Sequence, residues 1–127
     1  MDVKIDTKEK FTVITPNKDS FTENMSDKLI ALLSSYLQKD MPHLIVNMQN
    51  IISISEANAQ ALLNLQQQFQ EHQYSFVLCS LQPAVKAFLD QMNLLDLLNS
   101  TPSESEAWDI VQMEEIEREL LSDFDEE

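Results

Sequence analysis

The amino-acid sequence predicts one α/β domain built on a mixed central sheet with helices packed against it. Three observations lead to this fold class: an opening pair of alternating segments, two short apolar runs, and helical apolar spacing between and after those runs. Strands that alternate with helices are typical of a parallel sheet, and an opening hairpin adds an antiparallel edge. The length of 127 residues fits a single domain.

The opening hairpin is indicated by apolar residues that alternate with polar ones. Val3 and Ile5 form the first such pair and Phe11 and Val13 the second, so each segment predicts a short, half-buried strand. Residues 7–10 are the expected turn. They contain neither Asn-Gly nor Asp-Gly, so we expect a turn longer than the tightest hairpin type.

The first helix is expected to begin near Thr22 or Glu23, after a loop over residues 16–20. Its apolar residues recur at helical spacing and are Met25, Leu29, Leu32, Leu33 and Tyr36. Pro42 ends this helix, because the residue before a proline disfavours helix. The apolar run over residues 43–48 then predicts a central, buried strand.

The second helix has two candidate N-caps. Ser53, with Glu56 three residues later, matches a capping box, whereas Ser55 is suited to cap the helix alone. The helix itself carries one apolar stripe, made of Ala59, Leu62, Leu63 and Phe69, and leaves Gln60 and Asn64 on its polar side. Residues 74–79 follow as a second buried strand.

The rest of the chain predicts a short helix over residues 82–92, a compact apolar turn over 93–98 and a last helix over 104–122. The last helix carries two apolar stripes. Ala107, Trp108 and Val111 form the first, which fits the domain; the second consists of Ile110, Met113, Ile116, Leu120, Leu121 and Phe124. The second stripe either folds back on its own domain or docks on a partner or a second copy.

The charge of the chain is concentrated at its C-terminus. Residues 104–127 hold 11 acidic residues and one basic residue, Arg118, which gives −10 of the total of −14. We therefore predict a domain over residues 1–112 and an acidic helical extension and tail over residues 113–127. The tail is interpreted as solvated rather than as a weak Ca²⁺ site. A chain of this charge repels nucleic acid and anionic lipid, so neither is an expected partner.

Composition also excludes several classes of site. The chain contains no glycine, and P-loops, dinucleotide-binding turns and EF-hands all need glycine in their loops. The single cysteine, Cys79, excludes an internal disulfide and a Cys-rich zinc site, and we interpret it as a buried structural thiol. The charged N-terminus and the lack of a spanning apolar run lead us to expect a cytoplasmic protein.

Catalytic chemistry has little support in the sequence. His43 lies at the start of a predicted strand and His72 at the end of a predicted helix, and neither has a nucleophile and an orienting acid in a recognisable pattern. We therefore expect no enzyme activity, no bound metal and no cofactor. Ser53 and Ser55 precede a helix N-terminus, which favours negative charge, so both are candidate phosphorylation sites as well as plain caps.

The order of these elements resembles the STAS domain, the fold of bacterial anti-sigma factor antagonists. The resemblance covers roughly residues 3–112 and is carried by residues 44–48, 51–65, 76–78, 81–89 and 92–94. It implies a STAS-like mixed sheet, with an antiparallel N-terminal hairpin and parallel strands covered by helices.

The functional motif of the STAS family, D-S-S-G-L-G at the start of the second helix, is degenerate here. Aligned without gaps, the phosphoacceptor serine of the family falls on Ala57, and its glycines fall on Asn58 and Gln60. The aspartate of the preceding strand falls on Asn47. Glu56 adds one negative charge beside the phosphoacceptor position, although a phosphate carries more.

The resemblance implies a non-enzymatic signalling module whose protein partner is an anti-sigma factor, a serine-kinase-like protein or another signalling protein. Binding would use the residues around the second helix's N-terminus, which are Ser55, Glu56, Ala57, Asn58, Gln60 and Asn64. We expect this binding not to be switched by phosphorylation at Ala57, which has no hydroxyl group. The alternative is a scaffold or oligomerisation subunit, for example a homodimer, that uses the C-terminal amphipathic helix.

Overall fold

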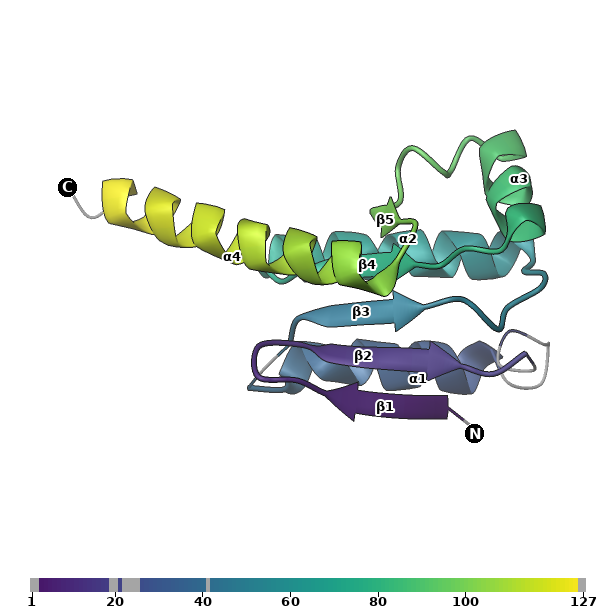
Figure 1. The fold of residues 1–127 in the computed structure, drawn as a ribbon, viewed down its shortest axis with the longest axis horizontal. Coiled ribbons are helices and arrows are strands. Elements are labelled where there is room, and N and C mark those ends of the chain that lie inside the picture. Colours follow the sequence, from purple (N-terminus) through teal and green to yellow (C-terminus); the bar gives the residue numbers. More distant parts are fainter. Residues whose placement is uncertain (1–2, 19–20, 22–25, 41, 126–127) are drawn as a thin grey trace.

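The computed structural model describes residues 3–18, 21, 26–40 and 42–125. Helices and strands alternate after an opening hairpin, which confirms the predicted fold class (Figure 1). The elements are β1 (Val3–Thr7), β2 (Thr12–Pro16), α1 (Ser26–Ser35), the 3₁₀ helix η1 (Tyr36–Gln38), β3 (Leu44–Asn47), α2 (Glu56–Glu71), β4 (Phe76–Cys79), α3 (Pro83–Gln91), β5 (Ser100–Thr101) and α4 (Glu104–Asp125).

The five strands form one sheet in the order β1-β2-β3-β4-β5. β1 is antiparallel to β2 and every other pair is parallel, as the sequence predicts. β5 was not predicted, because its two residues are too few to show the alternation that marks a strand. The predicted start of the first helix, near Thr22 or Glu23 and including Met25, lies outside the described residues.

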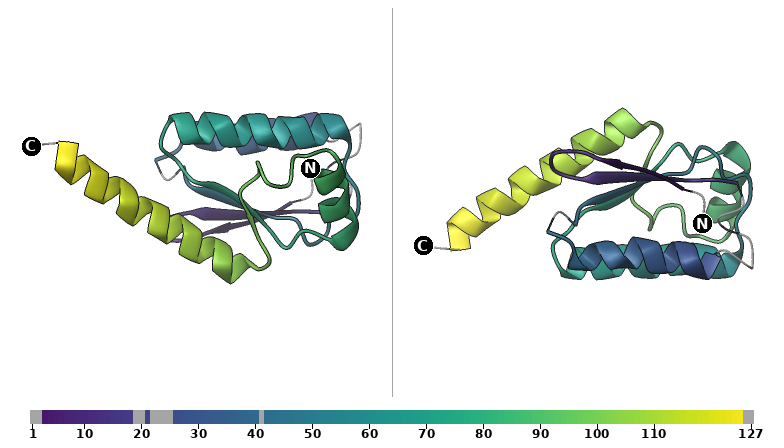
Figure 2. Two further views of the ribbon diagram at one scale, coloured as in Figure 1. Left: turned by 90° about the horizontal axis from the view of Figure 1, so that it is seen from above. Right: turned by 90° about the horizontal axis from the view of Figure 1, so that it is seen from below.

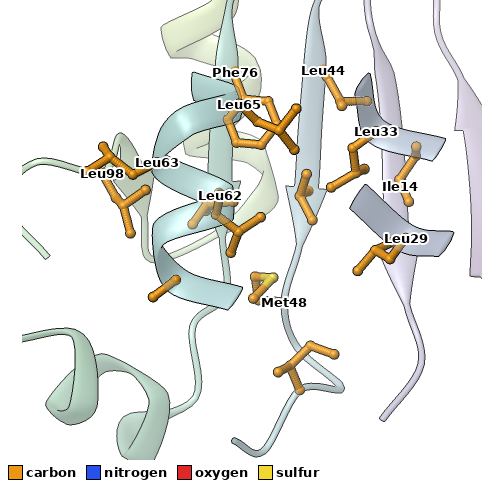
Figure 3. Packing of buried hydrophobic residues seen from close by; sticks show 14 of the residues in the cluster. Ile14, Leu29, Leu33, Leu44, Met48, Leu62, Leu63, Leu65, Phe76 and Leu98 are labelled. Atoms are coloured by element: carbon orange, nitrogen blue, oxygen red, sulfur yellow. The ribbon is translucent and has the colours of Figure 1, made fainter. Parts of the chain in front are cut away.

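Side chains of each central strand point alternately to two cores on opposite faces of the sheet. Leu44 and Val46 of β3 face the large core under α1 and α2, whereas Ile45 faces a smaller core under α4. Figure 2 shows α4 alone on its face of the sheet, with α1 and α2 side by side on the other. Figure 3 shows Leu62 and Leu65 of α2 and Leu29 and Leu33 of α1 in the large core.

The sequence predicts two half-buried hairpin strands, but the two strands differ in burial, and only Val3 of β1 is partly buried against the large core. β2 is buried on both faces, with Val13 exposed by 2% and Ile14 by 0%, because helices cover the sheet on either side of it. Ile5 of β1 is instead exposed by 48%, because β1 is the edge strand, beyond the helices that cover β2. Alternating apolar and polar residues in the sequence do not distinguish a strand buried on both faces from an exposed edge strand.

Two helices end in a left-handed residue that is not glycine. Gln73 follows α2 with φ of 62° and Asn93 follows α3 with φ of 59°. After α2, the N–H groups of Gln73 and Tyr74 donate to the carbonyls of Gln70 and Phe69, which is the Schellman pattern. The chain therefore makes glycine-type helix ends without glycine.

α4 runs without a break through the predicted boundary between residues 112 and 113. Ala107 and Val111 are fully buried against the sheet. In the predicted second apolar stripe, Ile110 packs against the smaller core, and the side chain of Phe124 lies outside the described residues. The other four residues do not fold back on the domain, since exposure is 59% at Met113, 57% at Ile116, 54% at Leu120 and 63% at Leu121. The C-terminal half of α4 extends past the sheet (Figure 1). In the described part of the chain, no helix has the length and apolarity needed to span a membrane.

Candidate functional site

The loop that leads from β3 into α2 ends in a well-formed N-cap. Ser55 has an extended backbone, and its hydroxyl accepts a hydrogen bond of 3.1 Å from the backbone N–H of Asn58. This geometry selects Ser55, and not the Ser53–Glu56 capping box, as the start of the helix. Ser53 is exposed in the loop before the cap.

The predicted site residues at this helix start do not all face the same way. Ser55, Glu56, Ala57, Gln60 and Asn64 are exposed, and their helical spacing places the last four on one side of α2. Asn58 is the exception. Its side chain is 9% exposed and its Nδ2 donates to the carbonyl of Phe21 at 2.9 Å. Asn58 therefore ties α2 to the segment before α1.

One prominent side chain of this site was missed from the sequence. Ile52 is exposed by 65%, between the fully buried Ile51 and the partly buried Ile54. The signal that was available is the pair Ile51-Ile52, because successive side chains of an extended segment point in opposite directions. The exposed side chains of this region, called the α2 surface below, are Ile52, Ser53, Ser55, Glu56, Ala57, Gln60 and Asn64.

Three elements, β3, α3 and α4, hold the loop that supports the α2 surface. At the end of β3, the Asn47 Oδ1 accepts from the Gln49 N–H at 3.0 Å, and its Nδ2 donates to Glu104 Oε1 of α4 at 3.2 Å. Gln82, the N-cap of α3, donates from its Nε2 to the carbonyl of Gln49. These bonds and the buried Ile51 give the α2 surface a fixed support.

The two histidines lie at the opposite end of the strands. His43 precedes β3, and its Nδ1 accepts a 3.1 Å hydrogen bond from the Ser75 N–H. Burial, together with the positive charge of Arg118, lowers the pKa of His43 from its ordinary value of 6.5. His72 is the C-cap of α2 and stacks on Tyr74. Neither histidine is placed to act on the serines that follow β3.

Cys79 is not a reactive thiol, and the described side chains form no metal-ligand cluster. Cys79 is fully buried, and this burial raises the pKa of its thiol to about 11. The protonated thiol is a poor nucleophile, so Cys79 is a structural residue. Among the residues described, no three His, Cys, Asp or Glu side chains come together as metal ligands would.

The family model described as STAS domain matches residues 2–107 of the chain. No curated protein gives a significant match. Three solved structures illustrate the similarity of fold. The Thermotoga maritima protein TM1081 superposes with a TM-score of 0.77 at 19% identity, covering 87% of this chain and 94% of its own.

The second is an anti-sigma-factor antagonist (STAS) domain protein from Planctomyces limnophilus, with a TM-score of 0.72, 16% identity and coverage of 84% of this chain and 95% of its own. The third is the anti-sigma factor antagonist SpoIIAA of Bacillus in its unphosphorylated form, with a TM-score of 0.70, 15% identity and coverage of 87% and 96%. At these identities the structures show a shared fold.

Proposed function

The chain belongs to the STAS domain family, and on this premise we propose that it is a non-enzymatic signalling module that binds a protein partner through the α2 surface. The observation that carries the proposal is Ile52, which is exposed by 65% amid polar neighbours on a well-supported loop. An exposed apolar side chain with a polar rim is a common composition for a protein interface. The partner class is an anti-sigma factor or a serine-kinase-like protein, and the module acts in the cytoplasm.

Partner binding at this surface is not released by phosphorylation at the usual position of the family. Ala57 occupies that position, is exposed and has no hydroxyl group to accept a phosphate. A phosphoserine there would bring a charge of about −1.5 to −2 into the interface. The hydroxyl of Ser55 is already engaged as the helix cap, which leaves a constitutive binding surface.

A bulky neutral substitution tests the surface directly. We expect Ala57→Tyr to abolish capture of the partner by the full chain from its native cells, because the added ring lies within the contact area. Ala31→Tyr is the matched control, since Ala31 is an exposed alanine in the middle of α1 and is not part of the α2 surface. Equal capture of the same partner by both variants would refute binding at this surface.

Incubation with the cognate serine kinase and ATP tests whether phosphorylation switches partner binding. We expect mass spectrometry to find no phosphate on Ser53 or Ser55 after incubation. A phosphate on Ser55 would overturn the constitutive model, and the cap bond to Asn58 would then be replaced by phosphate contacts at the helix N-terminus.

A second candidate function is that of a scaffold or oligomerisation subunit, in which residues 113–127 act as a separate segment. It is favoured by the exposed apolar side chains of Met113, Ile116, Leu120 and Leu121 on α4. Light scattering of the full chain and of a truncation after Val111 discriminates between the two functions. Self-association that is lost on truncation supports assembly, and a monomer in both cases rejects it.

A further inference from the structure

A cavity of about 420 Å³ lies at the end of the sheet opposite to the α2 surface. It forms where the edge of β4 is open, because β5 pairs only with Leu78 and Cys79 in the described part of the sheet. The end of α2 and the second half of α4 border this open edge, and both contribute side chains to the cavity. Cavities of this size hold small-molecule ligands in many proteins.

Two charged side chains of α4 line the cavity without pairing with each other. Glu114 and Arg118 are four residues apart, the spacing at which acidic and basic side chains often form a helical ion pair. The ion pairs among the described residues are instead Lys8–Asp6 and Lys10–Glu115. Glu114 and Arg118 thus lie beyond ion-pair distance of each other.

Each of these side chains retains hydrogen-bonding capacity. Arg118 Nη2 donates to Ser75 Oγ at 3.1 Å, which uses one of the five N–H donors of the guanidinium. Glu114 Oε1 is buried and has no hydrogen-bond partner. A buried carboxylate oxygen without a donor is costly, and such atoms are rare in folded proteins. The cavity is therefore lined by a carboxylate with one oxygen that lacks a donor and by a guanidinium with donors to spare.

We propose that this cavity binds a small zwitterion, of which a free α-amino acid is the simplest example. Its ammonium group would donate to the Glu114 carboxylate and its carboxylate would accept from Arg118, so that each charged side chain gains a partner of opposite charge. A simple anion would leave Glu114 without a donor, and a simple cation would face Arg118. The side-chain amides of Gln70, Gln73 and Asn99 also line the cavity and can both donate and accept.

Titration of the full-length chain with each standard L-amino acid tests this proposal. We expect at least one of them to cause saturable, millimolar-range NMR shifts of the side-chain amides of Gln70, Gln73 and Asn99. The same amino acid blocked by N-acetylation, or amidated at its carboxylate, should bind at least about tenfold more weakly, because one ionic contact is lost. Absence of saturable shifts with every amino acid, or equal binding of acetate alone, would overturn the proposal.

Two substitutions test whether the ligand binds to Glu114 and Arg118. Glu114→Gln and Arg118→Gln should each weaken binding by at least about tenfold. Glu117→Gln removes the same charge as Glu114→Gln from an exposed position of α4 and should leave the affinity unchanged. Circular dichroism of each variant verifies the fold. Wild-type affinity in both cavity variants would place the ligand elsewhere and reject the proposal, without bearing on partner binding at the α2 surface.

Discussion

Asn47 joins the support of the α2 surface to α4 through its bond with Glu104. It also stands where STAS relatives often carry an aspartate, so Asn47→Asp restores the family residue. We nevertheless expect this change to lower the free energy of unfolding by about 1–3 kcal/mol at neutral pH, because a donor becomes a carboxylate facing Glu104 Oε1. Urea unfolding of the variant measures the loss.

Two further variants isolate the cause of that loss. Asn50→Asp adds the same charge at an exposed position of the neighbouring turn, and it should change stability little. Asn47→Asp combined with Glu104→Gln should recover most of the loss, since the glutamine amide can donate to the new carboxylate. If the double variant is as unstable as Asn47→Asp alone, repulsion from Glu104 is not the cause.

His43 gives the fold a pH dependence of defined sign. Its pKa is lowered in the folded chain, by burial first and by Arg118 second, so the unfolded chain binds the proton more tightly. The stability that neutral His43 contributes is therefore complete above its unfolded pKa and is lost as the pH falls below 6.5. The slope cannot exceed about 1.4 kcal/mol per pH unit, the limit for one proton.

His43→Asn tests this prediction, because its side-chain carbonyl can still accept from the Ser75 N–H but does not titrate. We expect the free energy of unfolding of the variant to be flatter than that of the wild type between about pH 7 and 5.5, just above the range where carboxylates titrate. Identical pH profiles for the two proteins would show that His43 is not the titrating group.

A local sequence pattern is enough to predict an element such as a buried strand. It does not predict the position of a side chain that depends on contacts with a distant segment of the chain. The apolar runs of β3 and β4 identify buried strands without further information. Gln66 stands in a polar run, yet it is 3% exposed. Its side chain accepts from the Asn99 N–H at 2.7 Å and donates to the Leu97 carbonyl at 2.9 Å, ahead of the short β5.

The same contrast between local patterns and long-range contacts applies to the candidate site. A serine cap before α2 follows from the local helix signal, but the choice of Ser55 over Ser53 rests on the observed hydrogen bond from the Asn58 N–H. The inward turn of Asn58 depends on Phe21, a residue 37 positions earlier in the chain. The cavity beside Glu114 and Arg118 depends on the length of β5 and on the direction of α4, and neither quantity is encoded by a local pattern.

Helix α2 ends at a position that glycine would fill with less strain. Gln73 has φ of 62°, and a side chain with a Cβ is disfavoured in this left-handed region. We expect Gln73→Gly to raise the free energy of unfolding by about 0.5–1 kcal/mol, after allowing for the greater flexibility of glycine in the unfolded chain. Thermal and urea unfolding measure the gain.

Gln70→Gly is the control for this change, because Gln70 is an exposed residue inside the last turn of the same helix. Its replacement should lower stability by about 0.5–1 kcal/mol. Asn93→Gly should give a smaller gain than Gln73→Gly, since asparagine tolerates the left-handed region better than glutamine. A loss of stability in Gln73→Gly would show that its side chain contributes more than its backbone strain costs.

In residues 113–127, the negative charge disfavours self-association, whereas the exposed apolar side chains of α4 favour it. Residues 113–127 hold eight acidic residues and Arg118, a net charge of −7, while Met113, Ile116 and Leu120 offer apolar surface on the outer side of the helix. Two copies that met through this stripe would bring like charges together. Such repulsion between exposed charges is screened by salt, whereas apolar burial is not.

If α4 mediates assembly of this chain, its self-association should therefore strengthen with ionic strength. We expect analytical ultracentrifugation of the full chain to show a larger dimer fraction at about 0.5 M salt than at about 0.05 M, where the screening length is several times greater. The triple change of Met113, Ile116 and Leu120 to Gln should abolish the dimer at both salt concentrations. Asp109→Asn removes one negative charge from the outer side of the helix and should favour the dimer. A dimer fraction that falls with salt would mean that the copies meet through opposite charges and not through α4.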